Sequence, residues 1–265
     1  MTIFRAVEGS ILETQHGHIQ RILGIPFLAG TVDEAVRLVN RGGLLVVPAA
    51  PALKDLPRHS GYREALLGAD VVIPDSGFMV LIWNLIENKR IRRISGLTYL
   101  RFLLTQPEVR IPGNAFWIMA GERSAERNLT WLARQDITVP AESVYLAPMY
   151  GTHIDDAGLI ERLERDRPQH VIVTIGGGTQ ERLGLYLKKT LAYTPAIHCI
   201  GAAIAFLSGD QVCIPAWADK LYVGWLFRCI SQPKRYVPRY WRARALFGLM
   251  LKYRSELPPL EPETR

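Results

Sequence analysis

Short runs of apolar residues recur along the chain, and each run ends in glycine, proline or a polar residue. Between them lie longer stretches in which apolar residues return at helical spacing. This alternation indicates strands of a parallel sheet that are connected by helices and buried on both faces. The pattern predicts strands at residues 43–48, 70–74, 115–120, 143–146, 170–175 and 196–200. We therefore expect an α/β fold with a Rossmann-like parallel sheet covered by helices.

Three of the connecting segments carry recognisable helix signals. Residues 31–41 begin with Thr31, and Glu34 follows at the spacing of a capping box. Residues 155–165 begin with two acids and end with a base, which matches the helix dipole. Residues 180–190 set three leucines among polar side chains. Each segment predicts a helix between two strands.

Proline and glycine interrupt the alternating pattern twice. The first interruption, at residues 110–114, predicts two lobes: an N-terminal α/β lobe of residues 1–110 and a C-terminal α/β lobe of residues 111–214. After the second interruption the pattern stops, and residues 215–265 are expected to form a basic helical appendage. With 265 residues, of which 48% are hydrophobic, the chain is long enough to bury a sizeable core.

The expected appendage holds the excess positive charge. Residues 215–254 contain nine Lys or Arg and a single acid, Asp219, while the whole chain has a formal net charge of +7. Aromatic rings interleaved with Lys and Arg are typical of segments that lie on an anionic membrane surface. The aromatic residues are Trp217, Tyr222, Trp225, Phe227, Tyr236, Tyr240, Trp241, Phe247 and Tyr253.

Two other interpretations of the appendage stay open. Bases with aromatic rings also suit stacking on single-stranded nucleic acid, but the apolar run at residues 245–251 would be costly to expose there. In a third interpretation the appendage packs on the protein's own core or on a subunit partner. Uncovered apolar residues would suit a homo-oligomer. We expect a membrane surface, and no nucleic acid, as the partner.

The sequence argues against several classes of protein. The N-terminus lacks a long apolar run behind a basic start, which argues against a signal peptide, and no stretch of about 18 apolar residues predicts a spanning helix. Cys199, Cys213 and Cys229 lack the spacing of a zinc site or a disulfide framework, so we expect reduced thiols. These features predict a cytoplasmic protein that meets a membrane only from one side.

A glycine-rich loop is the first candidate for chemistry. Residues 176–178 are three glycines between the predicted strand 170–175 and a predicted helix, where backbone N–H groups are free to face a diphosphate. The loop matches neither GxGxxG nor a P-loop. An ordinary turn, with Gln180 and Glu181 on the helix surface, explains the same residues.

Two further segments place charged residues near the end of a strand. Asp75 lies on a Pro-Asp-Ser-Gly turn after strand 70–74, at the sheet edge where ligands collect and a general base would be wanted. A plain turn or helix cap also explains this residue. Arg93 follows Lys89, Arg90 and Arg92, which could neutralise a phosphate, although a charge run is usually a solvated face.

Six segments, taken in order, resemble the WecG/TagA/CpsF glycosyltransferases, bacterial enzymes that build lipid-linked surface polysaccharides. The resemblance runs from about residue 22 to residue 242. The segments are GIPFLAGTVDEAV, ADVVIPDSGFMV, RISGLTYL, FWIMAGERSAER, DRPQHVIVTIGGGTQE and IGAAIAFLSG.

The resemblance implies a role for each candidate residue. It makes Asp75 the catalytic base of an inverting sugar transfer that needs no metal or other cofactor. It places Arg93 on an arginine of the family and Glu181 in the loop that binds substrate. Four further residues fall on the nucleotide-sugar pocket, namely Gly121, Tyr150, Gly177 and Gln180.

The resemblance also implies the partners. A hexose-type sugar would move from a nucleotide-sugar donor to a polyprenyl-diphosphate-linked acceptor during exopolysaccharide or surface-glycan synthesis. The basic appendage would hold the enzyme on the inner face of the cell membrane, where that acceptor sits. The contacts to lipid phosphates would come from Arg228, Arg235, Arg239 and Arg242.

The chain departs from the family's pattern at four positions. Pro48 and Ala50 stand where the family has Thr and Asn, Thr179 replaces a Lys, and Ala205 replaces an Asp. The candidate base and the Gln-Glu pair of the loop are kept, which favours an active enzyme with changed donor specificity. The alternative is a non-catalytic, membrane-peripheral binding module of the same pathway.

Overall fold

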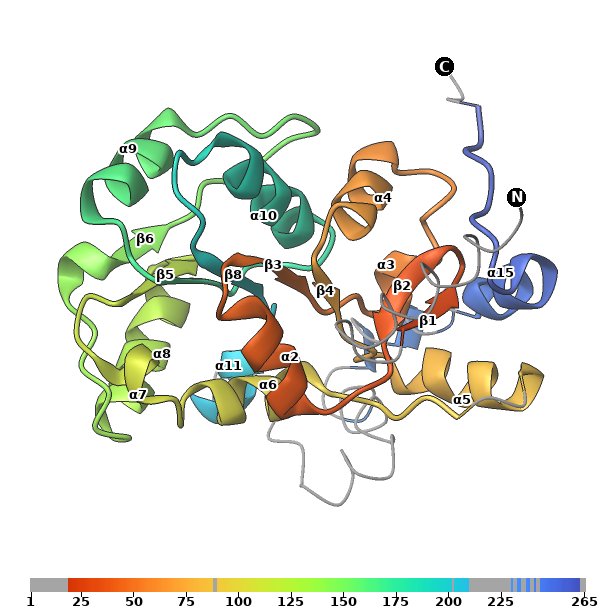
Figure 1. The fold of residues 1–265 in the computed structure, drawn as a ribbon, viewed down its shortest axis with the longest axis horizontal. Coiled ribbons are helices and arrows are strands. Elements are labelled where there is room, and N and C mark those ends of the chain that lie inside the picture. Colours follow the sequence, from red (N-terminus) through yellow and green to blue (C-terminus); the bar gives the residue numbers. More distant parts are fainter. Residues whose placement is uncertain are drawn as a thin grey trace, which may run out of the picture.

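The computed structural model describes residues 19–87, 90–201, 203–209, 230, 233–234, 237–238, 241 and 244–262. In this part of the chain, strands form one sheet with helices on both of its faces (Figure 1). The strands are β1 (Ile19–Ile22), β2 (Ile25–Leu28), β3 (Gly43–Val46), β4 (Val71–Val72), β5 (Ala115–Met119), β6 (Val144–Leu146), β7 (His170–Val173) and β8 (Ala196–Cys199).

The strands lie in the order β1-β2-β4-β3-β8-β7-β5-β6. Neighbours run parallel except for the antiparallel pair β1–β2 at one edge. Strands β3 to β8 lie within the apolar runs that predicted them, so the Rossmann-like α/β fold is confirmed. The hairpin β1–β2 turns at Leu23 and Gly24, whose φ angles of 51° and 75° are those that a two-residue type I′ turn needs.

Helices cover the two faces of the sheet in separate sets (Figure 1). One face carries α3 (Ala50–Leu53), α4 (Ser60–Leu67), α9 (Ala157–Asp166) and α10 (Thr179–Thr190). Helices α5 (Gly77–Ile86) and α15 (Ala245–Tyr253) pack on the same apolar core beside β1 and β2 (Figure 1). The other face carries α2 (Val32–Val39), α6 (Gly96–Leu103), α7 (Pro107–Arg110), α8 (Glu122–Ala133) and α11 (Ala203–Leu207).

Each face of the sheet has its own apolar core. Alternate residues of β3 serve the two cores, because Leu44 packs on the α10 side and Leu45 on the α2 side. The three helices with end signals form as predicted. The Thr31 side chain accepts a hydrogen bond from the Glu34 N–H at 3.2 Å and so caps α2.

The two expected lobes occupy the two halves of one sheet. Residues 1–110 supply β1 to β4, and residues 111–214 supply β5 to β8. The halves join where β3 pairs with β8 over the full length of both strands, from Gly43 opposite Ala196 to Val46 opposite Cys199. The division into two lobes stays a prediction, while the sheet itself is continuous across it.

The last part of the expected appendage packs on the core. Leu246 and Met250 of α15 are fully buried in the α10-side core. Beyond the helix, the Leu23 N–H donates to the Arg254 carbonyl at 2.7 Å, and the Arg63 guanidinium donates to the Pro258 carbonyl at 2.6 Å. An appendage separate from the core is therefore not confirmed for residues 245–262.

Replacing Met250 by Ala is expected to lower the free energy of unfolding by about 2–5 kcal/mol, because the side chain leaves a cavity in a closed core. Chemical denaturation of the full chain measures this loss. The matched control is Phe247→Ala on the same helix, where the ring is 43% exposed and the loss should be below about 1 kcal/mol. Equal losses would show that α15 does not dock as described.

Candidate active site

The carboxyl ends of the parallel strands meet at one edge of the sheet. From there β5 leads through α8 to β6, whereas its neighbour β7 leads through α10 to β8 in the opposite direction. The two helices also lie on opposite faces of the sheet. Ligands of open α/β sheets bind in the crevice at such a switch point. Gly121 and Gly178, the N-caps of α8 and α10, flank this switch point.

Asp75 lies at this edge, between the end of β4 and the start of α5. Its Oδ1 accepts a hydrogen bond from the Gly96 N–H at 2.9 Å. Arg93 donates from Nε to the Asp75 carbonyl oxygen at 2.6 Å and places Nη2 3.6 Å from Oδ1. The structure thus brings together two segments that the sequence singled out separately. The Asp75 side chain is 26% exposed, so a ligand can reach it.

Two serine caps hold this arrangement in place. The Ser76 Oγ accepts from the Met79 N–H at 3.1 Å and starts α5, and the Ser95 Oγ accepts from the Thr98 N–H at 3.0 Å and starts α6. Both serines are buried. Because Asp75 directly precedes the first cap and Gly96 follows the second, the two helix starts fix the distance between them.

The glycine loop after β7 is open to solvent. Gly176 and Gly177 are exposed, and a Cβ at either position would meet no atom within 4 Å. Gly178 has a φ of +91°, which favours glycine. The loop therefore leaves room for a ligand to approach its backbone closely.

Gln180 and Glu181 are not surface residues of α10. They are 2% and 1% exposed, which contradicts the interpretation that a plain turn leaves them on the helix surface. The Gln180 Oε1 accepts from the Gly201 N–H, and the Glu181 Oε2 accepts from the Gly178 N–H at 2.6 Å. Burial raises the pKa of the Glu181 carboxyl. Both side chains brace the glycine loop against the end of β8.

The two halves of the site meet at the end of β8. A Cβ on Gly96 would lie 3.5 Å from the Ile200 carbonyl oxygen, so α6 begins directly against this strand end. The next residue, Gly201, is the one held by Gln180. Asp75, Gly96, the end of β8 and the base of the glycine loop thus form one connected set of contacts.

Tyr150 belongs to a cluster around Asp156. Its hydroxyl donates to the Asp156 Oδ2 at 2.6 Å, and the Tyr145 hydroxyl donates to the same carboxylate at 2.9 Å. Burial, and then the hydrogen bond to Asp156, raise the pKa of Tyr150 and raise that of Tyr145 to about 12. The Tyr150 hydroxyl is thus occupied by the residue that caps α9.

Arg182 ties this cluster to the glycine loop. Its guanidinium donates to the Gly178 carbonyl at 3.2 Å and to the carbonyls of Gly151 and Thr152 at 2.8 and 2.7 Å. Sequence reasoning missed both Arg182 and Asp156. The only signal for Asp156 was its place at the start of a predicted helix, and nothing marked Arg182.

A comparison with models of protein families matches residues 20–258 to the WecG/TagA/CpsF family of glycosyl transferases. The chain belongs to this family. A comparison with characterised proteins finds no significant match. Because the match spans nearly the whole chain, the protein is a glycosyltransferase, and the sheet edge around Asp75 is its candidate active site.

Three of the four positions at which the resemblance led us to expect departures from the family's pattern are buried. Pro48 is buried, and Ala50 and Ala205 are each 5% exposed. Ala50 packs in the α10-side core and Ala205 lies in α11. Thr179, the first residue of α10, is half-buried.

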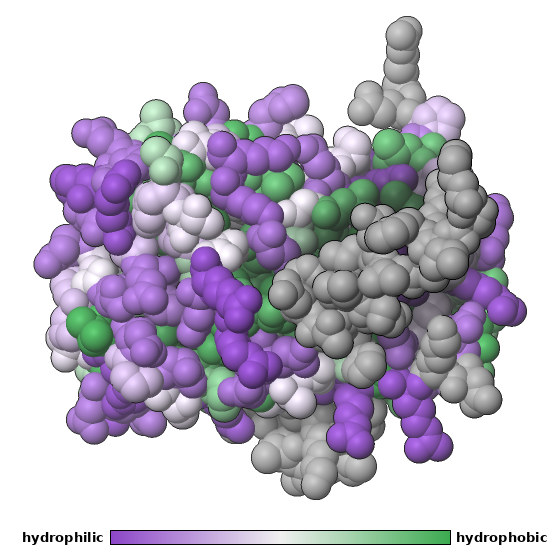
Figure 2. All heavy atoms as spheres, viewed as in Figure 1, coloured by the Kyte–Doolittle hydropathy of each residue, from purple (hydrophilic) through white to green (hydrophobic). Residues whose placement is uncertain are grey.

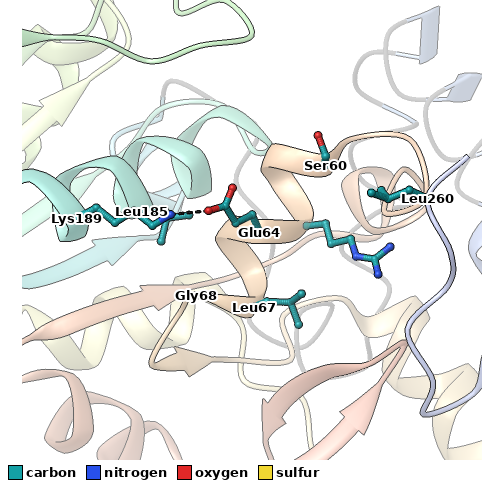
Figure 3. A pocket seen from close by; sticks show the side chains of 8 residues that line it. Ser60, Glu64, Leu67, Gly68, Leu185, Lys189 and Leu260 are labelled. Carbon is teal, nitrogen blue, oxygen red and sulfur yellow. Dashed lines mark hydrogen bonds and ion pairs between the residues drawn. The ribbon is translucent and has the colours of Figure 1, made fainter. Parts of the chain in front are cut away.

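A hollow lies between α4 and α10, and Asp75 is not among the residues that line it (Figure 3). Its volume is about 460 Å³. The charged groups that line it are already paired, because Lys189 contacts Glu64 and Arg63 donates to a backbone carbonyl.

Some predicted residues lie outside the part of the chain that the structure describes. Arg228, Arg235, Arg239 and Arg242 lie outside the described residues, as do Cys213 and Cys229. Cys199 is a buried free thiol whose pKa is raised by burial. Within the described part of the chain, no three His, Cys, Asp or Glu residues are grouped as metal ligands, and no helix has the length and apolar character needed to cross a membrane.

Proposed function

We propose that this glycosyltransferase inverts the anomeric centre while moving a hexose-type sugar from a nucleotide-sugar donor to a polyprenyl-diphosphate-linked acceptor. The observation that carries the proposal is the convergence of Asp75, the start of α6 and the glycine loop on the end of β8. A carboxylate and an open, glycine-rich helix start are the two parts that such a transfer needs.

Asp75 acts as the general base in this proposal. Its Oδ1 is held by the Gly96 N–H, while Oδ2 accepts no hydrogen bond from the described residues. Oδ2 takes the proton of the acceptor hydroxyl as that oxygen forms a bond to the anomeric carbon. The bond between the anomeric carbon and the phosphate oxygen breaks, and the nucleoside diphosphate leaves with the electron pair. Attack from the side opposite the leaving group inverts the anomeric carbon.

The leaving diphosphate is stabilised by the glycine loop and the N-terminus of α10. Backbone N–H groups at a helix start favour anions, and Gly176 and Gly177 let a phosphate come close. Arg93, beside Asp75, adds a positive charge to the same edge. In this proposal no metal ion takes part in the transfer.

The acceptor and the place of action follow from the charge of the C-terminal region. The bases of residues 215–254 would hold the enzyme on anionic lipid at the inner face of the cell membrane. A polyprenyl-linked acceptor is confined to that surface. We therefore propose exopolysaccharide or surface-glycan synthesis as the setting, with the cytoplasm supplying the nucleotide sugar.

Replacing Gly177 by Val is expected to weaken binding of the nucleotide sugar at least about tenfold, because the branched side chain fills the space that the diphosphate needs. Titration calorimetry measures the dissociation constant, with the donor taken from a thermal-shift screen of nucleotide sugars.

Gly158→Val is the matched control for this substitution. Gly158 is exposed on α9, and a Cβ there makes only an ordinary contact with Asp156. The Gly158→Val variant should bind the donor with the affinity of the wild type. Unchanged affinity in the Gly177→Val variant would show that the diphosphate does not bind at the glycine loop.

A further inference from the structure

The outer face of helix α5 is apolar and exposed. Phe78, Leu81 and Leu85 are 39%, 53% and 83% exposed, and their spacing of three and four residues places them on one side of the helix. None of the ten residues of α5 is charged. Hydrophilic side chains dominate the described part of the face in Figure 2. An apolar stripe without charge marks a surface that meets an apolar partner.

Helix α15 lies beside α5 and also exposes apolar side chains. It packs against α5, and the Arg254 Nη1 after α15 lies 3.6 Å from the Glu87 Oε1 after α5. Two apolar residues one turn apart on α15 are 43% and 47% exposed. We call the exposed apolar side chains of these helices the α5–α15 face. It consists of Phe78, Leu81, Leu85, Phe247 and Leu251.

Positive charge borders the α5–α15 face. Arg90 and Arg92 are exposed just after α5, and Arg244 and Lys252 are exposed at the two ends of α15. Apolar side chains bordered by Arg and Lys complement a lipid surface with anionic headgroups. In a dimer built on this face, the positively charged borders of the two copies would instead share one interface, which is unfavourable.

We propose that the α5–α15 face contacts the bilayer directly and orients the active site on it. Helix α5 begins at Gly77, two residues after Asp75, so insertion of its outer face holds the candidate base at the edge of the lipid surface. The inference rests on the proposed function only for the reason why this placement is useful. It assigns the orientation to a helix of the enzyme's core rather than to the C-terminal arginines.

The test uses the full chain and the double variant Leu81→Gln/Leu85→Gln in a flotation assay. The vesicles contain phosphatidylcholine and about one third phosphatidylglycerol. The fraction of protein bound to the vesicles gives a partition coefficient, and we expect that of the double variant to be at least about tenfold lower than that of the wild type. Its unfolding curve should match that of the wild type, because both leucines are exposed.

Leu67→Gln is the matched control, because Leu67 is 43% exposed on α4 and does not belong to the α5–α15 face. Its partition should be that of the wild type. Equal partition of the wild type and the double variant would overturn the proposal, and so would a wild type that does not bind vesicles. A variant that loses self-association in sedimentation velocity but keeps its partition would assign the face to a second copy, which also overturns it.

The assay needs no sugar donor, so its outcome is independent of the proposed transferase activity. If the wild type transfers sugar and the double variant binds vesicles as well as the wild type does, the proposed function stands and this inference is wrong. If the wild type transfers no sugar but the double variant loses vesicle binding, this inference stands and the proposed function is wrong.

Discussion

Replacing Asp75 by Asn is expected to slow sugar transfer by a factor of about 100 to 10,000, the usual contribution of a general base. The amide keeps an oxygen that can accept from the Gly96 N–H, so the start of α6 stays in place. It cannot take up the proton of the acceptor hydroxyl. Donor affinity should be unchanged, because the glycine loop that binds the diphosphate is not altered.

The matched control is Asp136→Asn. Asp136 is exposed and has a φ of 56°, a conformation that Asn tolerates well. Its transfer rate should equal that of the wild type in an assay of product by mass spectrometry. Full activity of the Asp75→Asn variant would show that this carboxylate is not the base. Loss of donor binding together with rate would show that Asp75 serves the pocket rather than the proton transfer.

Acidification from pH 7.5 to pH 5 should cost the protein about 2 kcal/mol of unfolding free energy through His170 alone. The side chain is fully buried and its Nδ1 lies 3.1 Å from the His198 Nε2, while the His198 Nδ1 lies 2.7 Å from the Tyr99 hydroxyl. These buried groups can form hydrogen bonds with one another while they are neutral, but a positively charged imidazole among them would be unfavourable.

The direction follows from the pKa values. Burial lowers the pKa of His170 from 6.5 to about 4, and burial with the neighbouring imidazole lowers that of His198 as well. Below about pH 6.5 these histidines therefore bind more protons in the unfolded chain than in the folded protein. The stabilisation is fully present above pH 6.5 and is lost as the pH falls towards 4.

Denaturant unfolding at the two pH values measures this effect against two variants. His170→Gln removes one titrating ring and should show a smaller loss on acidification, although it is less stable at pH 7.5. His153→Gln changes an exposed histidine and should behave like the wild type. If His170→Gln and the wild type lose the same free energy, the pKa of His170 is not lowered in the folded state.

The sheet could be predicted because most of its strands are buried on both faces. Such a strand, for example β7 (His170–Val173), contains an uninterrupted Val-Ile-Val run that needs no long-range information to be recognised. The apolar pattern did not predict the hairpin β1–β2, because its turn is Leu23-Gly24 instead of the Asn-Gly or Asp-Gly that marks type I′ turns. The pattern did not predict helix α5 either, because apolar residues on all sides of this helix show no helical periodicity.

The position of the site could be predicted, but not its contacts. Asp75 and the glycine loop each follow a strand, and parallel strands share one carboxyl edge. The Gly96 N–H that holds Asp75 is 21 residues away, and the carbonyls that Arg182 holds are 30 and 31 residues away. Such pairs depend on how the segments meet in the fold, which spacing along the chain does not encode. The burial of Gln180 has the same origin.

We expect the nucleotide sugar to bind at the sheet edge between the end of β4 and the start of α10. Amide hydrogen exchange of the full chain, with and without the nucleotide sugar that stabilises it most, tests this claim most directly. We predict slower exchange at residues 93–96, 120–122 and 176–182 when the donor is bound. Protection confined to the hollow between α4 and α10, or no stabilisation by any nucleotide sugar, would contradict the account.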